Sequence, residues 1–164
     1  MDWCNWVPLK CNIFVWRAEM DRIATVEALA KRGVLISDDM CFHCRSGPDS
    51  VDHLLVGCEL ALGLWEKISF WCRVQNFFAF SVRDLLEMSN YCNKGATEKA
   101  ALQGIVVIAC WFLWVARNNH RFSGKRCCVD DIFSEVRSTS FLWFKQRSKF
   151  GEIVWLDWCK FVFM

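Results

Sequence analysis

Apolar residues along the chain recur mainly at intervals of three and four, which is the spacing of amphipathic helices. The predicted helices cover residues 10–22, 26–32, 59–71, 81–88, 97–120 and 130–149. The sequence shows no internal repeat, no low-complexity segment and no convincing β-hairpin signal. The pattern therefore predicts an all-α fold, a small helical domain with a metal-binding loop followed by a short helical bundle.

Polar residues mark several of the predicted helix ends. Thr25 is a favourable N-cap for the second helix, and Gly33 is placed to end that helix. The sequence Ser81-x-x-Asp84 resembles a capping box, with aspartate in place of the usual glutamate. Asp130 is expected to cap the last long helix.

The helix 97–120 contains the most apolar run of the chain. Twelve consecutive apolar residues, 105–116, occupy its centre. A membrane span needs about 20 such residues, so a buried core helix is the favoured interpretation. Trp111 and Trp114 are then predicted to be core residues.

Two other helices and the C-terminal tail are predicted to bury apolar stripes. In helix 59–71 the stripe consists of Leu62, Trp65, Ile68, and Trp71 or Cys72. In helix 130–149 it consists of Val129, Ile132, Phe133, Val136, Ser140, Trp143 and Phe144. The tail, residues 153–164, is expected to pack back on the bundle through Trp155, Trp158 and Phe161.

Composition supports a folded chain and leaves the type of partner open. The 164 residues are 54% hydrophobic and include ten tryptophans, enough for the core of one domain or slightly more. Residues 1–80 carry eight Lys/Arg and ten Asp/Glu, and residues 81–164 carry twelve and eight, so the net charges are −2 and +4. This asymmetry favours an anionic partner of the second half only weakly, because a solvated surface is the simpler explanation.

Eleven cysteines raise the question of a disulfide framework. Their number is odd, no signal peptide precedes them, and several lie within predicted helices. We therefore expect an intracellular protein in a reducing compartment, the nucleus or the cytoplasm, without a transmembrane segment. Cysteines outside the stretch 41–58 are interpreted as core residues or free thiols.

The stretch 41–58 has the ligand spacing of a zinc site. Two residues separate Cys41 from Cys44, eight separate Cys44 from His53, and four separate His53 from Cys58. Three thiolates and one imidazole at such gaps suit tetrahedral Zn²⁺, with bonds of about 2.3 Å to sulfur and about 2.0 Å to nitrogen. Four protein ligands leave no open coordination position, so the sequence predicts one structural ion.

Two alternatives accompany this interpretation. In a chain so rich in cysteine, the spacing can arise by chance. His43 is a candidate to replace one of the four ligands, although a turn that aims Cys41 and Cys44 inward is expected to aim His43 outward.

The segments around the predicted ligands are expected to position them. Gly47-Pro48 supplies the bend that returns the chain between the two ligand pairs. Leu54 to Val56 are interpreted as one buried turn, and Gly57 as the residue that lets the backbone bend so that Cys58 faces the metal. The ion would then tie a loop to the first turn of helix 59–71.

Several stretches resemble the reverse-transcriptase zinc-binding domain of plant LINE-type (non-LTR) retrotransposons. They are Val7-Pro8-Leu9-Lys10 with Ile13-Phe14-Val15-Trp16-Arg17, Ala24-Thr25 with Leu29-Ala30-Lys31-Arg32-Gly33, and Cys41-x2-Cys44 with Asp49-Ser50-Val51-Asp52-His53-Leu54, Cys58, Trp65 and Trp71. The later sequence Trp111-x2-Trp114-x2-Arg117-Asn118, with Phe122, resembles the segment that often follows this domain. The resemblance implies a zinc-binding domain at residues 1–75 and a C-terminal helical extension at residues 76–164 that packs on it.

The resemblance also implies zinc ligands at the four residues that the spacing favours, Cys41, Cys44, His53 and Cys58. Arg45 departs from the family, which usually has glycine after the second cysteine. In the family this domain follows a reverse transcriptase, an RNA-directed DNA polymerase, and often an endonuclease. This chain has no Tyr-x-Asp-Asp motif and no Ser/His/Asp set, so we expect no enzyme activity. A product that starts at Met1 is expected to be a detached piece of a mobile element.

Two functions follow from these features. The first is a zinc-stabilised accessory module that binds RNA or DNA, with the parent reverse transcriptase domain as a further partner. Its predicted phosphate contacts are Arg117, Arg121, Lys125, Arg126, Lys145, Arg147 and Lys149. The alternative is a zinc-stabilised protein-interaction module, or a decayed fragment without function. Neither predicts a membrane or a small-molecule substrate as partner.

Overall fold

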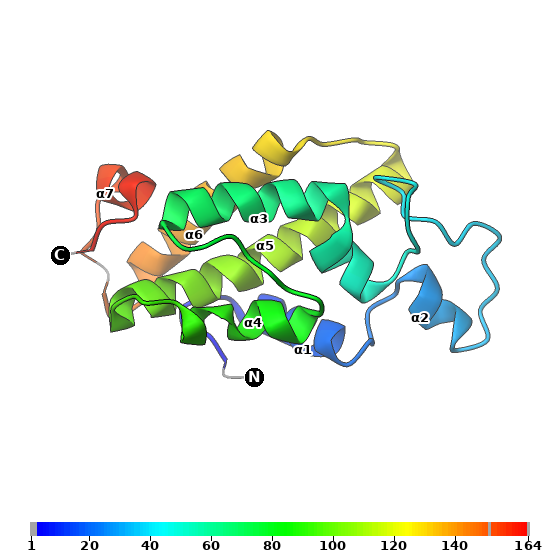
Figure 1. Ribbon diagram of the computed structural model, residues 1–164, viewed down its shortest axis with the longest axis horizontal. Coiled ribbons are helices and arrows are strands. Elements are labelled where there is room, and N and C mark those ends of the chain that lie inside the picture. The colour runs from blue at the N-terminus through cyan, green and yellow to red at the C-terminus, as the bar shows by residue number, and fades with distance from the viewer. Residues whose placement is uncertain (1–2, 151, 164) are drawn as a thin grey trace.

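The computed structural model describes residues 3–150 and 152–163, and its regular structure is helical (Figure 1). The elements are α1 (Leu9–Glu19), α2 (Val26–Ala30), the π-helix η1 (His53–Gly57), α3 (Glu59–Cys72), α4 (Val82–Tyr91), α5 (Ala96–Ser123), α6 (Val129–Arg147) and α7 (Trp155–Lys160). Over the described residues, the β-type pairing is limited to an isolated antiparallel bridge between Met40 and Pro48. The all-α prediction is confirmed, and α7 is an additional short helix in the tail.

Helix α5 runs through the centre of the molecule, with α1 and α4 on one side and α3 and α6 on the other (Figure 1). Helix α2 and the loop of residues 31–52, which we call the metal loop, lie at one end of the bundle, and α7 lies at the other. By length and composition α5 could cross a membrane, but 61% of its most apolar 18-residue window is buried inside the protein. Contacts on both sides give α5 the environment of a core helix.

Trp111 and Trp114 are less enclosed than predicted. Both rings are half-buried and pack on Phe14 of α1, with centroid distances of 5.5 Å and 5.8 Å. They form the contact between α5 and α1 rather than the centre of the core.

The capping residues of α2 and α4 are those predicted. The Thr25 hydroxyl accepts a hydrogen bond from the Ala28 amide at 3.2 Å. Ser81 and Asp84 form a capping box, in which the Asp84 carboxylate accepts the Ser81 amide at 3.0 Å. Both ends therefore follow from local sequence alone.

The prediction that Asp130 caps α6 is wrong. The helix begins at Val129, so the third helical position is occupied by Asp131, whose carboxylate accepts the Cys128 amide at 3.1 Å. Asp130 points instead to α3 and pairs with Lys67 at 2.7 Å. The N-cap is Cys128, two residues before the expected Asp130, so Asp131 supplies the capping carboxylate from the third helical position.

Some residues of the predicted apolar stripes lie outside the core. Leu62 is 54% exposed, because it lies off the buried face of α3, which contains Ala61, Trp65 and Ile68. Trp155 is also exposed, whereas Trp158 and Phe161 are buried and hold the tail on the bundle. In α6 the core residues are Ile132, Val136, Ser140 and Phe144, with Val129, Phe133 and Trp143 only partly buried.

One continuous hydrophobic core extends from the N-terminal segment to α7. Trp6 lies beside α5, where its indole Nε1 donates to the Ala100 carbonyl oxygen at 3.0 Å. Trp71 of α3 donates through Nε1 to the Trp158 carbonyl oxygen at 2.9 Å. The two predicted parts of the chain thus share one core, and the division between them at residue 75 stays a prediction.

Gly104 allows the Trp6 ring to lie directly on the backbone of α5. A Cβ atom at this position would collide with the six-membered ring of Trp6. We expect Gly104→Ala to lower the free energy of unfolding by about 2 kcal/mol, because overpacking outweighs the gain in helix propensity. Urea unfolding followed by circular dichroism measures this difference.

Gly63→Ala is the matched control in α3. Its added methyl group would meet only the Val129 side chain, at 3.0 Å, and that partly exposed side chain can shift. We expect at most a small change in stability for this variant. Equal destabilisation by both substitutions would show that the Trp6 contact is not what constrains Gly104.

Candidate metal centre

The side chains of Cys41, Cys44, His53 and Cys58 converge on one point at the end of the bundle. One donor atom from each lies within 4.8 Å of all the others. The Sγ atoms of Cys41 and Cys58 are 3.7 Å apart, and Sγ of Cys44 lies 3.1 Å from Nε2 of His53. Tetrahedral bonds of about 2.3 Å would place two sulfur ligands about 3.8 Å apart. The type and spacing of these donors fit a zinc ion.

A tight turn in the metal loop presents the first two thiols. The Arg45 amide donates to the Cys41 carbonyl oxygen at 3.0 Å, and the Cys41 amide donates to the Gly47 carbonyl oxygen at 2.7 Å. Arg45 adopts the left-handed conformation, with φ of 57°. Glycine adopts this conformation without strain, which explains why it is the usual residue after the second cysteine in the family that the sequence resembles.

The Arg45 side chain makes an ion pair that glycine could not make. Its Nη1 atom lies 2.7 Å from Oδ2 of Asp38, on the other arm of the loop. The hydrogen bond from Arg45 lowers the pKa of Asp38 below its ordinary value. Both side chains are largely exposed, so this pair adds little to stability.

The π-helix η1 places the third and fourth donors on the same side of the chain. The Cys58 amide donates to the His53 carbonyl oxygen at 2.6 Å, five residues earlier. In an α-helix, residues five apart point about 140° away from each other, so a regular helix could not aim both side chains at one ion. Leu54, Leu55 and Val56 are buried and anchor this turn in the core, as predicted.

The backbone leaves the helical conformation at Cys58, not at Gly57 as predicted. Cys58 is extended, with ψ of 141°, and precedes the first residue of α3. The glycine that the site requires is Gly47, because a Cβ atom there would lie 2.6 Å from both Nδ1 and Cε1 of His53. Gly47 therefore lets the imidazole ring lie against the metal loop with Nε2 directed at the thiols.

The two buried thiols differ in how readily they lose a proton. Cys41 and Cys58 are each 1% exposed and share a hydrogen bond. This bond lowers the pKa of Cys41, helped by the backbone amides of Cys44 and His43, and it raises the pKa of Cys58. The cluster thus favours one thiolate before any cation is bound, and a divalent cation would supply the charge that the other thiols need to ionise.

His43 lies outside this cluster of donors. Its ring faces His120 of α5, with centroids 5.2 Å apart, and its Nε2 atom is buried without a hydrogen-bond partner. Burial lowers the pKa of His43. His43 belongs to the contact between the metal loop and α5.

Asp49 connects the metal loop to the core, a role that the sequence did not indicate. Its carboxylate accepts the Val26 amide at 3.0 Å and forms a short ion pair with Arg117 of α5. Arg121 lies 3.3 Å from the same carboxylate. The helical spacing could have indicated that Arg117 is buried, because Arg117 lies one turn after the buried residue Leu113 on the same face of α5.

Two of the predicted phosphate contacts are therefore occupied inside the protein. Arg117 is only 1% exposed, and its guanidinium group also lies over the Trp114 ring at 5.0 Å. Its prediction as a nucleic-acid contact is wrong, because a buried and paired guanidinium group cannot reach a phosphate. Arg121 is largely buried beside Phe42 and Asp49.

The other five basic residues form two groups at opposite ends of α6. Lys125 and Arg126 precede the helix, whereas Lys145, Arg147 and Lys149 lie at its end. A helix of 19 residues is about 28 Å long, well beyond the screening length of about 10 Å at 0.1 M salt. The two groups therefore act as independent charges.

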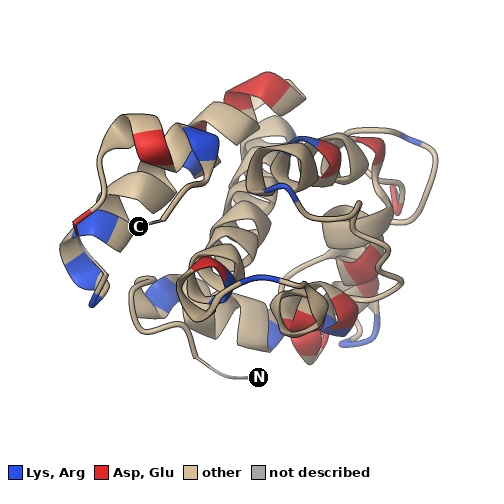
Figure 2. Ribbon diagram, turned by 60° about the vertical axis from the view of Figure 1, so that its left-hand side comes forward, with Lys and Arg blue, Asp and Glu red and all other residues tan. Residues whose placement is uncertain are grey.

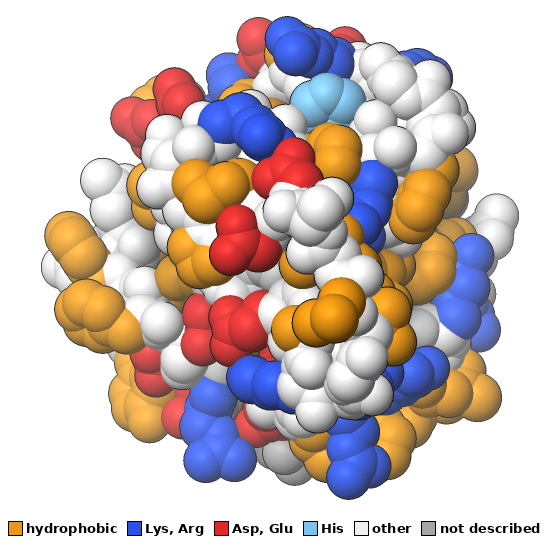
Figure 3. Space-filling model, turned by 90° about the vertical axis from the view of Figure 1, so that its right-hand side faces the viewer, with side chains coloured by type: hydrophobic (Ala, Val, Ile, Leu, Met, Phe, Trp, Pro, Cys, Tyr) orange, Lys and Arg blue, Asp and Glu red, His pale blue; other side chains and the backbone are white. Residues whose placement is uncertain are grey.

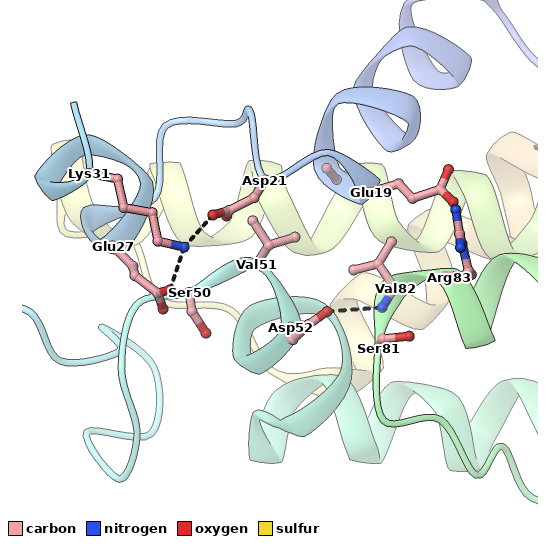
Figure 4. A pocket seen from close by; sticks show the side chains of 11 residues that line it. Glu19, Asp21, Glu27, Lys31, Ser50, Val51, Asp52, Ser81, Val82 and Arg83 are labelled. Carbon is pink, nitrogen blue, oxygen red and sulfur yellow. Dashed lines mark hydrogen bonds and ion pairs between the residues drawn. The ribbon is translucent and has the colours of Figure 1, made fainter.

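A cleft of about 300 Å³ between α1, α2 and α4 gathers further charged residues (Figure 4). Lys31 bridges Asp21 at 2.6 Å and Glu27 at 2.8 Å. Arg83 pairs with Glu19 at 2.9 Å, and the carboxylate of Asp52 accepts the Val82 amide at 3.0 Å. These carboxylates are already bonded to neighbouring groups. The cleft is therefore a weaker candidate for a metal site than the cluster of three thiols and His53.

Comparison with known proteins agrees with the geometry. Residues 1–65, which include all four donors, match the family described as zinc-binding in reverse transcriptase. The chain is also 26% identical over 132 residues to an Arabidopsis thaliana protein named "Putative ribonuclease H protein". That alignment covers 79% of this chain and 21% of the relative, so the chain spans about a fifth of the relative's length. No solved structure gives a significant match. The match and the convergence of the four donors both support a reverse-transcriptase zinc-binding domain at residues 1–65.

Proposed function

We propose that the chain is an accessory module of a retrotransposon-derived reverse transcriptase polyprotein, of the LINE type, that contributes nucleic-acid binding and not polymerisation. One structural zinc ion would be held by Cys41, Cys44, His53 and Cys58. The convergence of these four donors carries the proposal, because a complete tetrahedral set supplies cross-links between the metal loop and α3 and leaves no site for a reacting water.

The exposed end of α6 is the surface best suited to phosphate. Lys145, Arg147 and Lys149 are exposed, and none of them forms an ion pair with another residue of the described ranges. Figure 2 shows Lys and Arg along the end of the helix that leads into α7. Lys10 and Arg147 both lie near Cys11, where they oppose the rise in the pKa of that thiol caused by burial.

The metal-loop end of the molecule is less suitable. Figure 3 shows acidic and basic side chains side by side on this face. Lys125 and Arg126 line a cleft together with Asp131 and Glu135. The mixture of signs there weakens the attraction for a polyanion, so we assign the main phosphate contacts to the end of α6.

Neutralising the end of α6 tests this assignment. We expect the triple variant Lys145→Gln, Arg147→Gln, Lys149→Gln to bind RNA and DNA more weakly, irrespective of sequence. Each lost phosphate contact should reduce the slope of log K against log salt by about 0.7 for single strands and about 0.9 for duplex DNA. Fluorescence anisotropy of labelled oligonucleotides across a salt series measures both quantities.

The double variant Lys125→Gln, Arg126→Gln is the matched control and should change the slope less. Equal slopes for the wild type and the triple variant would remove the assignment to α6. Absence of any RNA or DNA binding by the wild type at micromolar concentration in low salt would overturn the proposed function.

Exposed aromatic residues favour a second candidate function, a protein-interaction module. Phe70, Phe80 and Phe122 are largely exposed, which is unusual for such large apolar side chains. The reverse transcriptase domain of the parent element is the partner that this candidate would take. Concentration-dependent self-association or partner capture that is lost when these rings are replaced, without nucleic-acid binding, would support it.

We also propose a reducing intracellular compartment. All eleven cysteines lie in the described residues, and each is a free thiol. Thiols of this kind, several of them buried in α-helices, persist where disulfides are kept reduced. Oxidation of Cys41 or Cys58 would remove zinc donors, so metal binding itself requires such conditions.

A further inference from the structure

We propose that an aromatic cleft at the other end of the bundle binds single-stranded nucleic acid by base stacking, an inference that rests on the proposed nucleic-acid function. The cleft lies between the connector that follows α3, the end of α4 and the start of α5 (Figure 1). Its volume is about 430 Å³. Its lining includes Arg73, Gln75, Phe78, Tyr91, Asn93 and Lys94.

Two aromatic rings stand at the cleft with their surfaces open to solvent. Phe78 is 82% exposed, and Tyr91 is 79% exposed. Phe77, in the connector that follows α3, packs edge-on against the Trp65 ring, with centroids 5.5 Å apart. This contact fixes the connector backbone next to Phe78. Exposed rings on a fixed backbone are the platform on which unpaired bases stack.

The charge of the lining suits a phosphate backbone. It contains no aspartate or glutamate, and its exposed cation is Arg73, because Lys94 is paired with Glu98 and its side chain is only 18% exposed. The nearest carboxylate on α5, Glu98, is engaged by the Gly95 amide at 2.9 Å and by Lys94 at 3.4 Å.

Two other clefts in the described part of the chain lack this combination. The cleft in Figure 4 is lined by four carboxylates, and a neighbouring cleft that Tyr91 also borders contains Glu19 and Glu87. Amide side chains in the aromatic cleft, Gln75, Asn76 and Asn93, can donate to and accept from the edges of bases. Rings, cations and amides together favour a nucleic acid over an apolar protein segment, and open base faces favour a single strand over a duplex.

Binding of a labelled single-stranded RNA, and of the duplex of the same sequence, tests the cleft at moderate salt. We expect Phe78→Ala and Tyr91→Ala each to raise the Kd for the single strand about tenfold, with little change for the duplex. The slope of log K against log salt should remain that of the wild type, because no phosphate contact is lost. Tyr91→Phe, which keeps the ring, should bind like the wild type.

Leu35→Ala is the control, since Leu35 is an exposed apolar residue in the metal loop, at the opposite end of the bundle. Thermal unfolding of each variant verifies that exposed substitutions leave the fold intact. If the wild type binds RNA and the variants Phe78→Ala and Tyr91→Ala bind it equally well, the cleft is not the binding site. The proposed nucleic-acid function would then still stand. Wild-type protein that binds no nucleic acid would overturn the proposed function itself. If Phe78→Ala or Tyr91→Ala abolished self-association of the protein but left RNA binding unchanged, the cleft would be a protein-docking site. That result would also overturn the proposal that the cleft binds single-stranded nucleic acid.

Discussion

Serine at position 58 is expected to abolish zinc binding and to unfold the metal loop. Cys58 supplies the donor that joins the loop to α3, and its Sγ atom lies 3.7 Å from that of Cys41. Structural zinc sites contribute apparent binding free energies of about 10–16 kcal/mol in small zinc-finger peptides, so loss of one ligand removes several kcal/mol of stability. Elemental analysis should fall from about one zinc per chain toward zero, and thermal unfolding should begin at a lower temperature.

Cys128→Ser is the matched control for this variant. Cys128 is an exposed thiol outside the donor set, and serine can replace its hydrogen bond to Asp131. We expect its zinc content and unfolding temperature to match the wild type. A strong chelator should reproduce the Cys58→Ser result in the wild type. Unchanged thermal stability of the wild type in the chelator would contradict a structural role for the metal.

The second large effect is expected from Asp49→Ala. This substitution removes the carboxylate that pairs with the buried Arg117 side chain and accepts the Val26 amide. An unpaired guanidinium group would remain in the core, at a cost of about 3–5 kcal/mol to the free energy of unfolding. Urea unfolding measures this loss, and zinc content measured on the folded variant separates it from loss of the metal.

Asp38→Ala is the corresponding control at an exposed ion pair. Asp38 lies 2.7 Å from Arg45, but both side chains are largely solvated, so we expect little or no change in the free energy of unfolding. Replacing both members of the buried pair, Asp49→Leu with Arg117→Met, should destabilise less than Asp49→Ala alone. If Asp49→Ala were no worse than Asp38→Ala, the pair would not be what fastens the metal loop to α5.

Most features that depend on neighbouring residues were predictable from the sequence, although the cap of α6 was assigned to Asp130 instead of Asp131. The caps at Thr25 and Ser81 involve residues three apart, and the helical periodicity extends over single segments. The four candidate metal donors lie within an 18-residue stretch, 41–58, and their spacing is what predicts a zinc site. Such signals need no knowledge of how distant segments pack.

Features that depend on distant residues were not predictable in the same way. Asp49 and Arg117 are 68 residues apart, and only the packing of the metal loop on α5 reveals that they meet. The sequence therefore placed Arg117 with the solvent-exposed cations. Similarly, the aromatic cleft is formed by three segments, and their apolar residues look like core until the exposure of Phe78 and Tyr91 is known.

The Asp49–Arg117 ion pair limits where this chain can be truncated without loss of its fold. The family match ends at residue 65, and a fragment ending there would retain every zinc donor. It would also retain an enclosed carboxylate whose counter-ion lies on α5, together with a Trp6 ring that no longer has a helix to rest on. We therefore expect the smallest fragment that folds on its own to extend beyond the match to the family, at least through Arg117.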